Sequence, residues 1–190
     1  RERAGRQRWQ TRGMLFPSLV FSAALLSFAG SAAGAQDAAK HNFPPRADAS
    51  YEARVTRVSD GDTLWVKPLT GGKYRKLRID GIDAPEICQD GGLASKEALA
   101  ARLLEKVVVV RERRRDDYGR PLVKLQLGDE DVAGWLVSEG HAWSYHWRHS
   151  NGPYAEQEAR ARERRKGLFA QDRPEVPRDF RRRNGPCPWP

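Results

Sequence analysis

The chain has 190 residues and a formal net charge of +9. This length suits one domain with extensions rather than several domains. The positive charge favours a polyanionic partner, either nucleic acid or an anionic surface polymer, although charge that only aids solubility is the alternative.

The first 35 residues have the order of a secretory signal peptide. Five Arg and one Glu are followed by an apolar run from Met14 to Ala29 and by small residues around Ala33-Gly34-Ala35, which predicts cleavage after Ala35. A transmembrane anchor is the alternative, but the apolar run is shorter than the ~20 residues that a span needs. We therefore expect an exported protein, periplasmic or secreted, without stable membrane association after cleavage.

Cleavage leaves 155 residues with a net charge of +5, which is enough chain to bury a core. Residues 36–49 are polar, small and proline-bearing, as a linker is. Three strands are predicted next, over residues 51–60, 62–69 and 73–82, and together they form a meander. A helix follows over residues 92–106, with a predicted apolar stripe of Leu93, Ala100, Leu103, Leu104 and, just beyond it, Val107.

In the second half of the chain, the sequence pattern predicts two more strands and two helices. The run "VVVVRERRR" (107–115) has too many apolar residues for one face, so part of it is expected to be buried on both sides. "RPLVKLQL" (120–127) returns the chain, and Asp131 is a candidate cap for a helix that ends at Gly140. A short extended piece, "HAWSYHW", precedes a charged helix over residues 154–170.

A helix between the third and fourth strands of a five-stranded antiparallel unit is the layout of the OB-fold. We therefore predict an α+β protein: an OB-fold five-stranded β-barrel with about three helices, over residues 50–170. Residues 171–190 are predicted to be a basic, proline-containing tail.

Carboxylates crowd two bends at strand ends. Asp60 and Asp62 flank Gly61 in the first bend, and "LRIDGIDAPE" carries Asp80, Asp83 and Glu86 in the second. Each bend alone is typical of an ordinary Asx turn. Clustered carboxylates, however, require raised pKa values or a bound cation. Oxygen ligands without a Cys or His pattern favour Ca²⁺ or Mg²⁺ over zinc.

Two arginines stand where phosphodiester cleavage would use them. Arg78 directly precedes the second acidic bend, and Arg120 follows the turn "DDYG". Forked guanidiniums near a cation site bind phosphate oxygens and stabilise the charge of a transition state. An exposed strand arginine is otherwise usually just solvated.

The segments "SDGDTLWV", "LRIDGIDAPE" and "DDYGRPLVKL" occur in order at suitable distances. Over about residues 50 to 170 the chain therefore resembles the staphylococcal nuclease (thermonuclease) family. This resemblance implies an OB-type barrel with added helices. It also implies a Ca²⁺-dependent phosphodiesterase that cuts DNA and RNA and leaves 5′-hydroxyl and 3′-phosphate ends.

The resemblance also implies residue roles. The carboxylates of Asp62 and Asp83 and the backbone carbonyl of Ala84 would hold Ca²⁺, and Glu86 would be the general base. Arg78 and Arg120 would bind the scissile phosphate, and Tyr118 would contact a terminal phosphate. The chain departs from the best-known member at two positions: Ala84 replaces a threonine, and Asp117 replaces a lysine that helps to bind phosphate. We read Asp80 as an ordinary surface acid.

Two cysteines, Cys88 and Cys187, both follow the predicted cleavage site. In an oxidising compartment they are expected to form a disulfide that ties the bend after Glu86 to the tail. Two unrelated free thiols are the alternative.

Other polar and aromatic features have simpler interpretations. His141, His146 and His149 fit a solvated loop better than a zinc site. The basic runs "RARERRKG" and "RDFRRRNG" could contact phosphate, but such runs are typical of solvated faces. Trp143, Tyr145 and Trp147 alternate, and either packing or base stacking explains them; which of Tyr145, His146 and Trp147 faces a nucleotide stays open.

Two further functions compete with a monomeric nuclease. One is a non-catalytic OB-fold protein that only binds nucleic acid or protein, against which stands the presence of every acid and arginine named above. The other is a cell-surface adhesion or scavenging protein for anionic polymers, which predicts salt-sensitive binding without cleavage.

Overall fold

The computed structural model describes residues 50–146 and 148–188. The predicted signal peptide and linker and Trp147 lie outside the described residues. Within the described ranges, no helix is both long and apolar enough to cross a membrane. The elements in chain order are β1 (Ser50–Asp60), β2 (Thr63–Pro68), β3 (Arg75–Ile79), β4 (Ile82–Asp83), α1 (Gly92–Leu103), β5 (Val107–Arg115), β6 (Pro121–Leu127), β7 (Glu130–Asp131), α2 (Val132–Ser138), β8 (Trp143–Ser144), α3 (Ala155–Glu163), the 3₁₀ helix η1 (Gly167–Ala170) and α4 (Pro177–Asn184).

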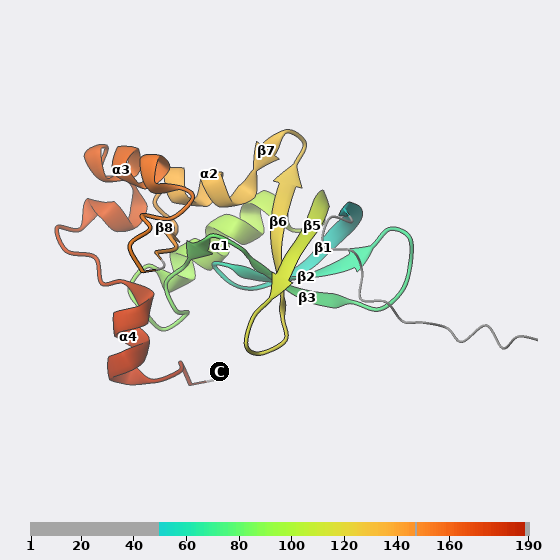
Figure 1. Cartoon of the computed structure of the whole chain (residues 1–190), viewed down its shortest axis with the longest axis horizontal. Helices are drawn as coiled ribbons and strands as arrows, with labels where there is room; N and C mark the ends of the chain where they lie inside the picture. The colour runs from blue at the N-terminus through green and yellow to red at the C-terminus, as the bar shows by residue number, and fades with distance from the viewer. Residues whose placement is uncertain (1–49, 147, 189–190) are drawn as a thin grey trace, which may run out of the picture. The chain divides into compact units, whose positions relative to one another are not determined.

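Five strands form a closed barrel, as predicted. The hydrogen-bonded order is β3-β2-β1-β5-β6, and β3 also pairs with β6 in parallel, with Arg78 opposite Leu122. The barrel lies on one side of the molecule, while α3, η1 and α4 lie on the other (Figure 1). This closure brings the end of β3 beside the start of β6, so residues 78 and 120 belong to one region of the barrel.

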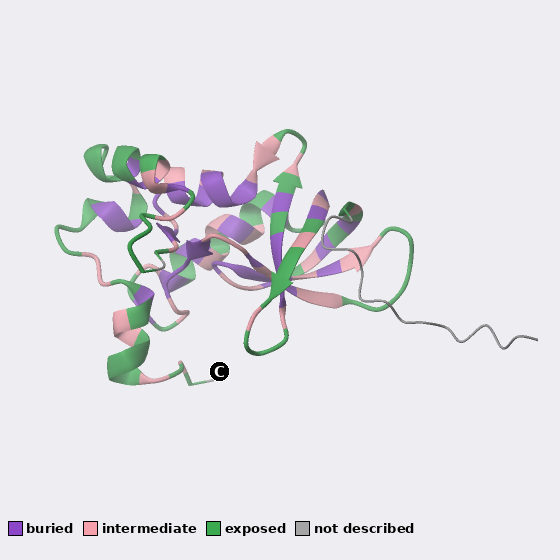
Figure 2. Cartoon of the chain, viewed as in Figure 1, coloured by how far each residue is buried: buried purple, intermediate pink, exposed green. Residues whose placement is uncertain are grey.

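Alternation along the strands fills the barrel interior (Figure 2). Val55, Val66, Leu77 and Leu125 are fully buried, as expected for period-2 side chains that face a closed core. In β1 the register shifts between Val55 and Arg57. This irregularity allows Val55 and Val58, three residues apart, to face inward together.

Strand β5 corrects one prediction. We expected "VVVVRERRR" to be buried partly on both sides, but Val108 and Val110 are buried while Val107 is exposed and Val109 is half-buried. The strand therefore presents one face to the barrel interior, and its outer face carries no covering layer that would bury the alternate valines.

Helix α1 also differs from its prediction. Leu93 and Leu104 are 57% and 45% exposed, and the buried face is made instead by Gly92, Ser95, Leu99 and Leu103. A Cβ at position 92 would lie 1.9 Å from the carbonyl oxygen of Glu86, so only glycine permits this close start of the helix. The helix ends at Leu103 because its C-cap, Leu104, has an extended ψ of 132°.

The C-terminal helices confirm some expectations and add one helix. Asp131 caps α2 by accepting a hydrogen bond from the Ala133 amide at 3.2 Å, and Gly140 follows the helix with φ 73°. The charged helix predicted to run to residue 170 stops at Glu163, and η1 follows. Helix α4 falls in the segment that we predicted to be a tail, and it begins with Pro177 at its first helical position.

Candidate active site

Side chains from both acidic bends meet at one arginine. Arg78, on β3, donates to Asp62 Oδ2 through Nε at 3.1 Å and Nη2 at 2.8 Å, and to Asp83 Oδ1 through Nη2 at 3.2 Å. The backbone amide of Ile79 donates to the carbonyl of Asp62 at 2.8 Å and fixes the first bend against β3. Asp62 and Asp83 are both only 7% exposed, so this cluster is largely removed from water.

The first bend is shaped by close packing against α1. Asp60 Oδ1 accepts a hydrogen bond from the Asp62 amide at 3.1 Å, and Thr63 Oγ1 donates to Asp62 Oδ1 at 2.8 Å. A Cβ on Gly61 would lie 2.1 Å from Ser95 Oγ, a buried hydroxyl of α1. Glycine at this position therefore lets the turn lie directly on the helix and point Asp62 at Arg78.

The electrostatics of the cluster show an excess of carboxylates. Burial, together with the neighbouring Asp62, raises the pKa of Asp60 to about 7. Burial also raises the pKa of Asp83, against the opposing effect of two arginines. For Asp62 burial acts in the same direction, but the guanidinium of Arg78 outweighs it and lowers the pKa. The cluster thus holds more negative charge than Arg78 alone compensates.

A second guanidinium reaches the same carboxylates from α4. Arg181 Nη1 donates to Glu86 Oε1 at 2.6 Å, and Arg181 Nη2 donates to Asp83 Oδ2 at 3.3 Å. Glu86 is therefore joined to the Asp62–Arg78–Asp83 cluster through Asp83 and Arg181. We had read the run that contains Arg181 as a solvated face, and this interpretation was wrong for Arg181.

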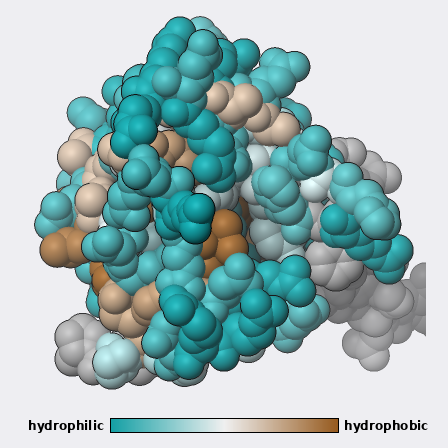
Figure 3. Space-filling model, turned by 90° about the vertical axis from the view of Figure 1, so that its left-hand side faces the viewer, coloured by the Kyte–Doolittle hydropathy of each residue, from teal (hydrophilic) through white to brown (hydrophobic). Residues whose placement is uncertain are grey.

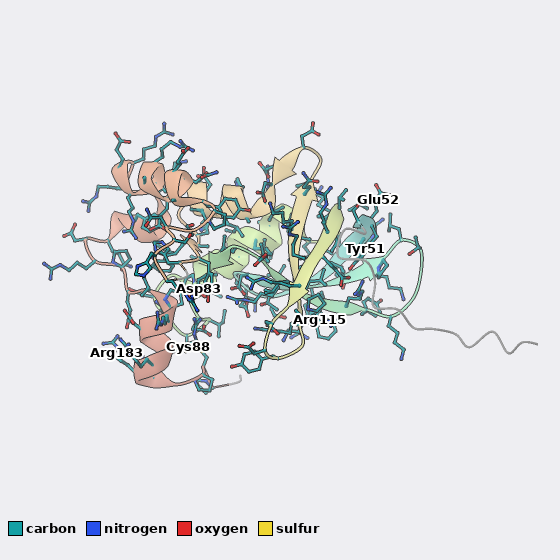
Figure 4. All side chains as sticks on the ribbon, in the orientation of Figure 1. Tyr51, Glu52, Asp83, Cys88, Arg115 and Arg183 are labelled. Atoms are coloured by element: carbon teal, nitrogen blue, oxygen red, sulfur yellow. A yellow bond between two sulfur atoms is a disulfide. The ribbon has the colours of Figure 1, made fainter. Side chains whose placement is uncertain are left out.

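Covalent and polar contacts hold α4 in this place. Cys88 and Cys187 form the predicted disulfide. Of the two, Cys88 lies two residues beyond Glu86 in the chain. Gln89 Oε1 accepts a hydrogen bond from the Glu86 amide at 3.1 Å, while Gln89 Nε2 donates to the carbonyl of Glu175 at 2.6 Å. Asp83 and Cys88 lie beside α4 in Figure 4. The predicted disulfide was the signal that the basic tail lies at the acidic bend.

The two sequence-predicted arginines line one cavity of about 550 Å³, together with Tyr118 and Tyr145. Arg120 Nε donates to Asp116 Oδ2 at 2.7 Å, and its guanidinium lies 5.4 Å from the centre of the Tyr118 ring. Tyr118 is 85% exposed, so its ring and hydroxyl are open to a ligand. The cavity is also lined by Arg114 and Arg115, so it presents four guanidiniums and an accessible phenol, which suits a phosphate-bearing ligand.

The structure also places three further residues from the sequence analysis. Asp80 also lines the cavity, and it pairs with Arg114 at 3.2 Å rather than standing as an isolated surface acid. Trp143 is buried and packs edge-on against Phe169, with ring centroids 6.0 Å apart, so packing explains it. Tyr145 is the member of the aromatic alternation that reaches the cavity.

The oxygen donors at the two acidic bends suit a hard cation, although these donors are few. Asp62 and Asp83 supply carboxylate oxygens beside the buried backbone of Ala84, and oxygen donors are those that Ca²⁺ prefers. The raised pKa of Asp60 marks a local excess of negative charge that a cation would relieve. Among the described residues, no three His, Cys, Asp or Glu side chains group as a ready metal site. Both carboxylates contact guanidiniums, so an ion would replace part of those contacts.

The histidines offer no metal centre within the described part of the chain. His146, whose side chain is 54% exposed, has its Nε2 3.7 Å from Glu158 Oε2. His141 packs against Trp135 with ring centroids 5.9 Å apart, and burial lowers its pKa. The contacts that the structure gives these two histidines are therefore with Glu158 and with Trp135.

Comparison with known proteins finds a family and several relatives that this chain resembles. The family pattern described as "Staphylococcal nuclease homologue" matches residues 76–171. A Haemophilus influenzae protein named "Uncharacterized endonuclease" is 35% identical over 131 residues, which are 68% of this chain and 72% of that protein. A protein of the same name from Escherichia coli O157:H7 is 33% identical over 71% of this chain and 88% of its own. A Shigella flexneri protein named "Micrococcal nuclease" is 30% identical over 70% of this chain and 82% of its own.

Proposed function

The chain belongs to the staphylococcal nuclease family and is a nuclease, and on that premise we propose that it is a calcium-dependent endonuclease acting on DNA and RNA. The observation that carries this proposal is the contact of one arginine, Arg78, with carboxylates of both acidic bends, beside a cavity that Arg120 also lines. The products are fragments with 5′-hydroxyl and 3′-phosphate ends.

Asp62, Asp83 and the carbonyl of Ala84 are the residues that would hold the ion. When bound, Ca²⁺ supplies positive charge to a phosphate oxygen and lowers the negative charge that an attacking nucleophile meets. The buried position of both carboxylates supports this assignment, because burial strengthens their attraction for a cation. Hard oxygen donors favour Ca²⁺ over transition metals.

Glu86 is the general base in this proposal. Its carboxylate accepts a proton from the water that attacks phosphorus, while the bond between phosphorus and the 5′ oxygen breaks. The leaving oxygen takes a proton from solvent and becomes the 5′-hydroxyl, and the phosphate stays on the 3′ side. The side chain of Glu86 is 27% exposed, which supports the role because water reaches it.

Arg78 and Arg120 bind the oxygens of the scissile phosphate and hold them more strongly as negative charge accumulates. Tyr118 contacts a terminal phosphate from the open side of the cavity. Asp117, where the best-known member has a lysine, weakens that terminal contact because an acid repels phosphate. The enzyme is therefore expected to depend little on terminal phosphates.

We further propose that the protein acts outside the cytoplasm, as a monomer. The disulfide between Cys88 and Cys187 supports this location, because such bonds persist in oxidising compartments. The order of basic, apolar and small residues over positions 1–35 supports export.

A gel that contains DNA tests the proposal directly. The purified chain is renatured in the gel with a chelator, and a parallel lane receives excess Ca²⁺. We expect clearing only with Ca²⁺ and none for Glu86→Gln. Clearing that the chelator leaves undiminished refutes the metal role, while binding without clearing in any lane identifies a non-catalytic OB-fold protein instead.

A further inference from the structure

A second cavity, of about 860 Å³, is lined by Asp83, the carboxylate that Arg78 contacts. Its walls come from the segment after β8, from α3 and from α4, and they include Asp83, Tyr145, Arg178 and Arg181. Its volume falls within the ~300–1,000 Å³ of typical ligand sites. Tyr145 lines both cavities. The two cavities therefore adjoin at the proposed catalytic cluster.

Positive charge predominates on the α4 wall. Arg178 and Arg181 are three residues apart, so they share a face of the helix. The acids of this cavity are largely compensated: Asp179 accepts from Arg182 at 2.9 Å, and Glu158 accepts from Arg162 at 2.7 Å. Arg178 forms no ion pair with any residue of the described ranges. The wall thus presents a guanidinium that no carboxylate of residues 50–146 or 148–188 engages.

Helix α4 is held rigidly enough to serve as a wall. The disulfide joins the chain three residues beyond α4 to the loop that carries Glu86, and Gln89 bonds the backbone just before the helix. The face that carries α3 and α4 is largely hydrophilic in Figure 3. A rigid, basic and hydrophilic wall beside a hydrolytic site fits a charged ligand better than an apolar one.

We propose that this second cavity is a strand subsite, which binds the backbone of single-stranded nucleic acid next to the scissile phosphate. The proposal rests on the nuclease function proposed above and names the path of its substrate. Arg178 binds a backbone phosphate one or more nucleotides from the cleaved bond, and Tyr145, which lines both cavities, offers an aromatic side chain to the strand. A positively charged groove with an aromatic residue is the usual arrangement for binding single strands without sequence preference.

The subsite makes binding depend on substrate length. A dinucleotide that fills the cavity of Arg78 and Arg120 does not reach Arg178, whereas a 12-nucleotide strand does. Removing Arg178 therefore weakens binding of the long strand only. It also reduces the slope of the log association constant against log salt concentration by roughly one, because one phosphate contact is lost.

The experiment measures binding separately from cleavage. Fluorescence anisotropy records the Kd of labelled dinucleotide and 12-nucleotide thymidine strands for the full disulfide-bonded chain carrying Glu86→Gln. The same background then receives Arg178→Gln or, as a matched control, Arg183→Gln. Arg183 is on the same helix and carries the same charge, but neither it nor its partner Glu175 lines the cavity, and its side chain is 65% exposed.

We expect Arg178→Gln to weaken binding of the 12-nucleotide strand roughly tenfold, as loss of one charge-assisted contact does. Dinucleotide binding stays unchanged, and Arg183→Gln stays within about twofold for both lengths. Repeating the series with native Glu86 in chelator checks that the background substitution has not loosened Arg181.

Each contrary outcome has a distinct meaning. Equal losses for Arg178→Gln and Arg183→Gln, or equal losses at both lengths, overturn the subsite, since they indicate a general charge effect. If the wild-type chain cleaves DNA while Arg178→Gln binds both lengths normally, the subsite fails and the nuclease proposal stands. If the wild-type chain never cleaves but Arg178→Gln still weakens binding of the long strand only, the nuclease proposal fails and the subsite stands.

Discussion

Replacing Arg78 by glutamine should destabilise the folded chain strongly at neutral pH. The guanidinium contacts Asp62 and Asp83, whose side chains are only 10% and 11% exposed. Removing one partner of a buried ion pair leaves the other charge uncompensated and costs about 3–5 kcal/mol. We expect a loss of this size for Arg78→Gln at pH 8 in the absence of divalent ions.

The loss should shrink as the solution is acidified. In the wild type, Arg78 lowers the pKa of Asp62, so the stability from this carboxylate is present above its unfolded pKa, about 3.9, and is lost as pH falls through the folded pKa. In the variant, burial without the guanidinium raises the pKa of Asp62. The loss of folding stability caused by this buried, charged carboxylate is then complete above the raised pKa, and it disappears as pH falls toward about 4. The difference between the two proteins therefore decreases from pH 8 to pH 4.

Urea unfolding followed by tryptophan fluorescence at pH 8, 6 and 4 measures this difference. Arg102→Gln is the matched control, because its pair with Glu130 is a surface contact whose side chains are 42% and 34% exposed, worth less than about 1 kcal/mol. The reasoning is refuted if Arg78→Gln is no more destabilised than the control at pH 8, or if its loss is the same at every pH.

Three further predictions concern the loop, the ion and the base. Replacing Cys88 and Cys187 by serine should lower the free energy of unfolding in urea by up to about 4.7 kcal/mol, because the bond closes a loop with a separation of 99 residues; an unchanged midpoint contradicts this. Excess Ca²⁺ should raise the melting temperature of the wild type by a shift that Asp83→Asn largely abolishes, and equal shifts in both proteins remove Asp83 from the ion site. Glu86→Gln should melt within a few degrees of the wild type yet lose most turnover in a plasmid digestion, since its side chain is partly exposed and its proposed role is chemical; near wild-type turnover refutes the base assignment.

The barrel and the core of the site were predictable because their signals are local. Alternating strands, the helix between the third and fourth strand and the acidic bends fix which residues end each strand. Closure of the barrel then brings Asp62, Arg78 and Asp83 together. The cap at Asp131 was predictable for the same reason, since its side chain bonds an amide two residues away.

Features that depend on distant partners were not predictable. The exposed Leu93 looks like a core residue in the helical pattern, but the close approach of Gly92 to Glu86 turns the helix so that Ser95 is buried instead. Arg181 belongs to a basic run whose composition indicates only solvation. Its contact with Glu86 spans 95 residues and follows from where the disulfide anchors the tail.

The central claim is that the cluster of Asp62, Arg78 and Asp83, with Glu86 beside it, hydrolyses the bond to the 5′ oxygen with the help of a bound calcium ion. Analysis of the ends of DNA fragments, produced with Ca²⁺ and with chelator, tests it most directly. The account predicts 5′-hydroxyl and 3′-phosphate ends with Ca²⁺ and intact DNA in chelator. Fragments with 5′-phosphate ends, or cutting that chelation does not reduce, would contradict it.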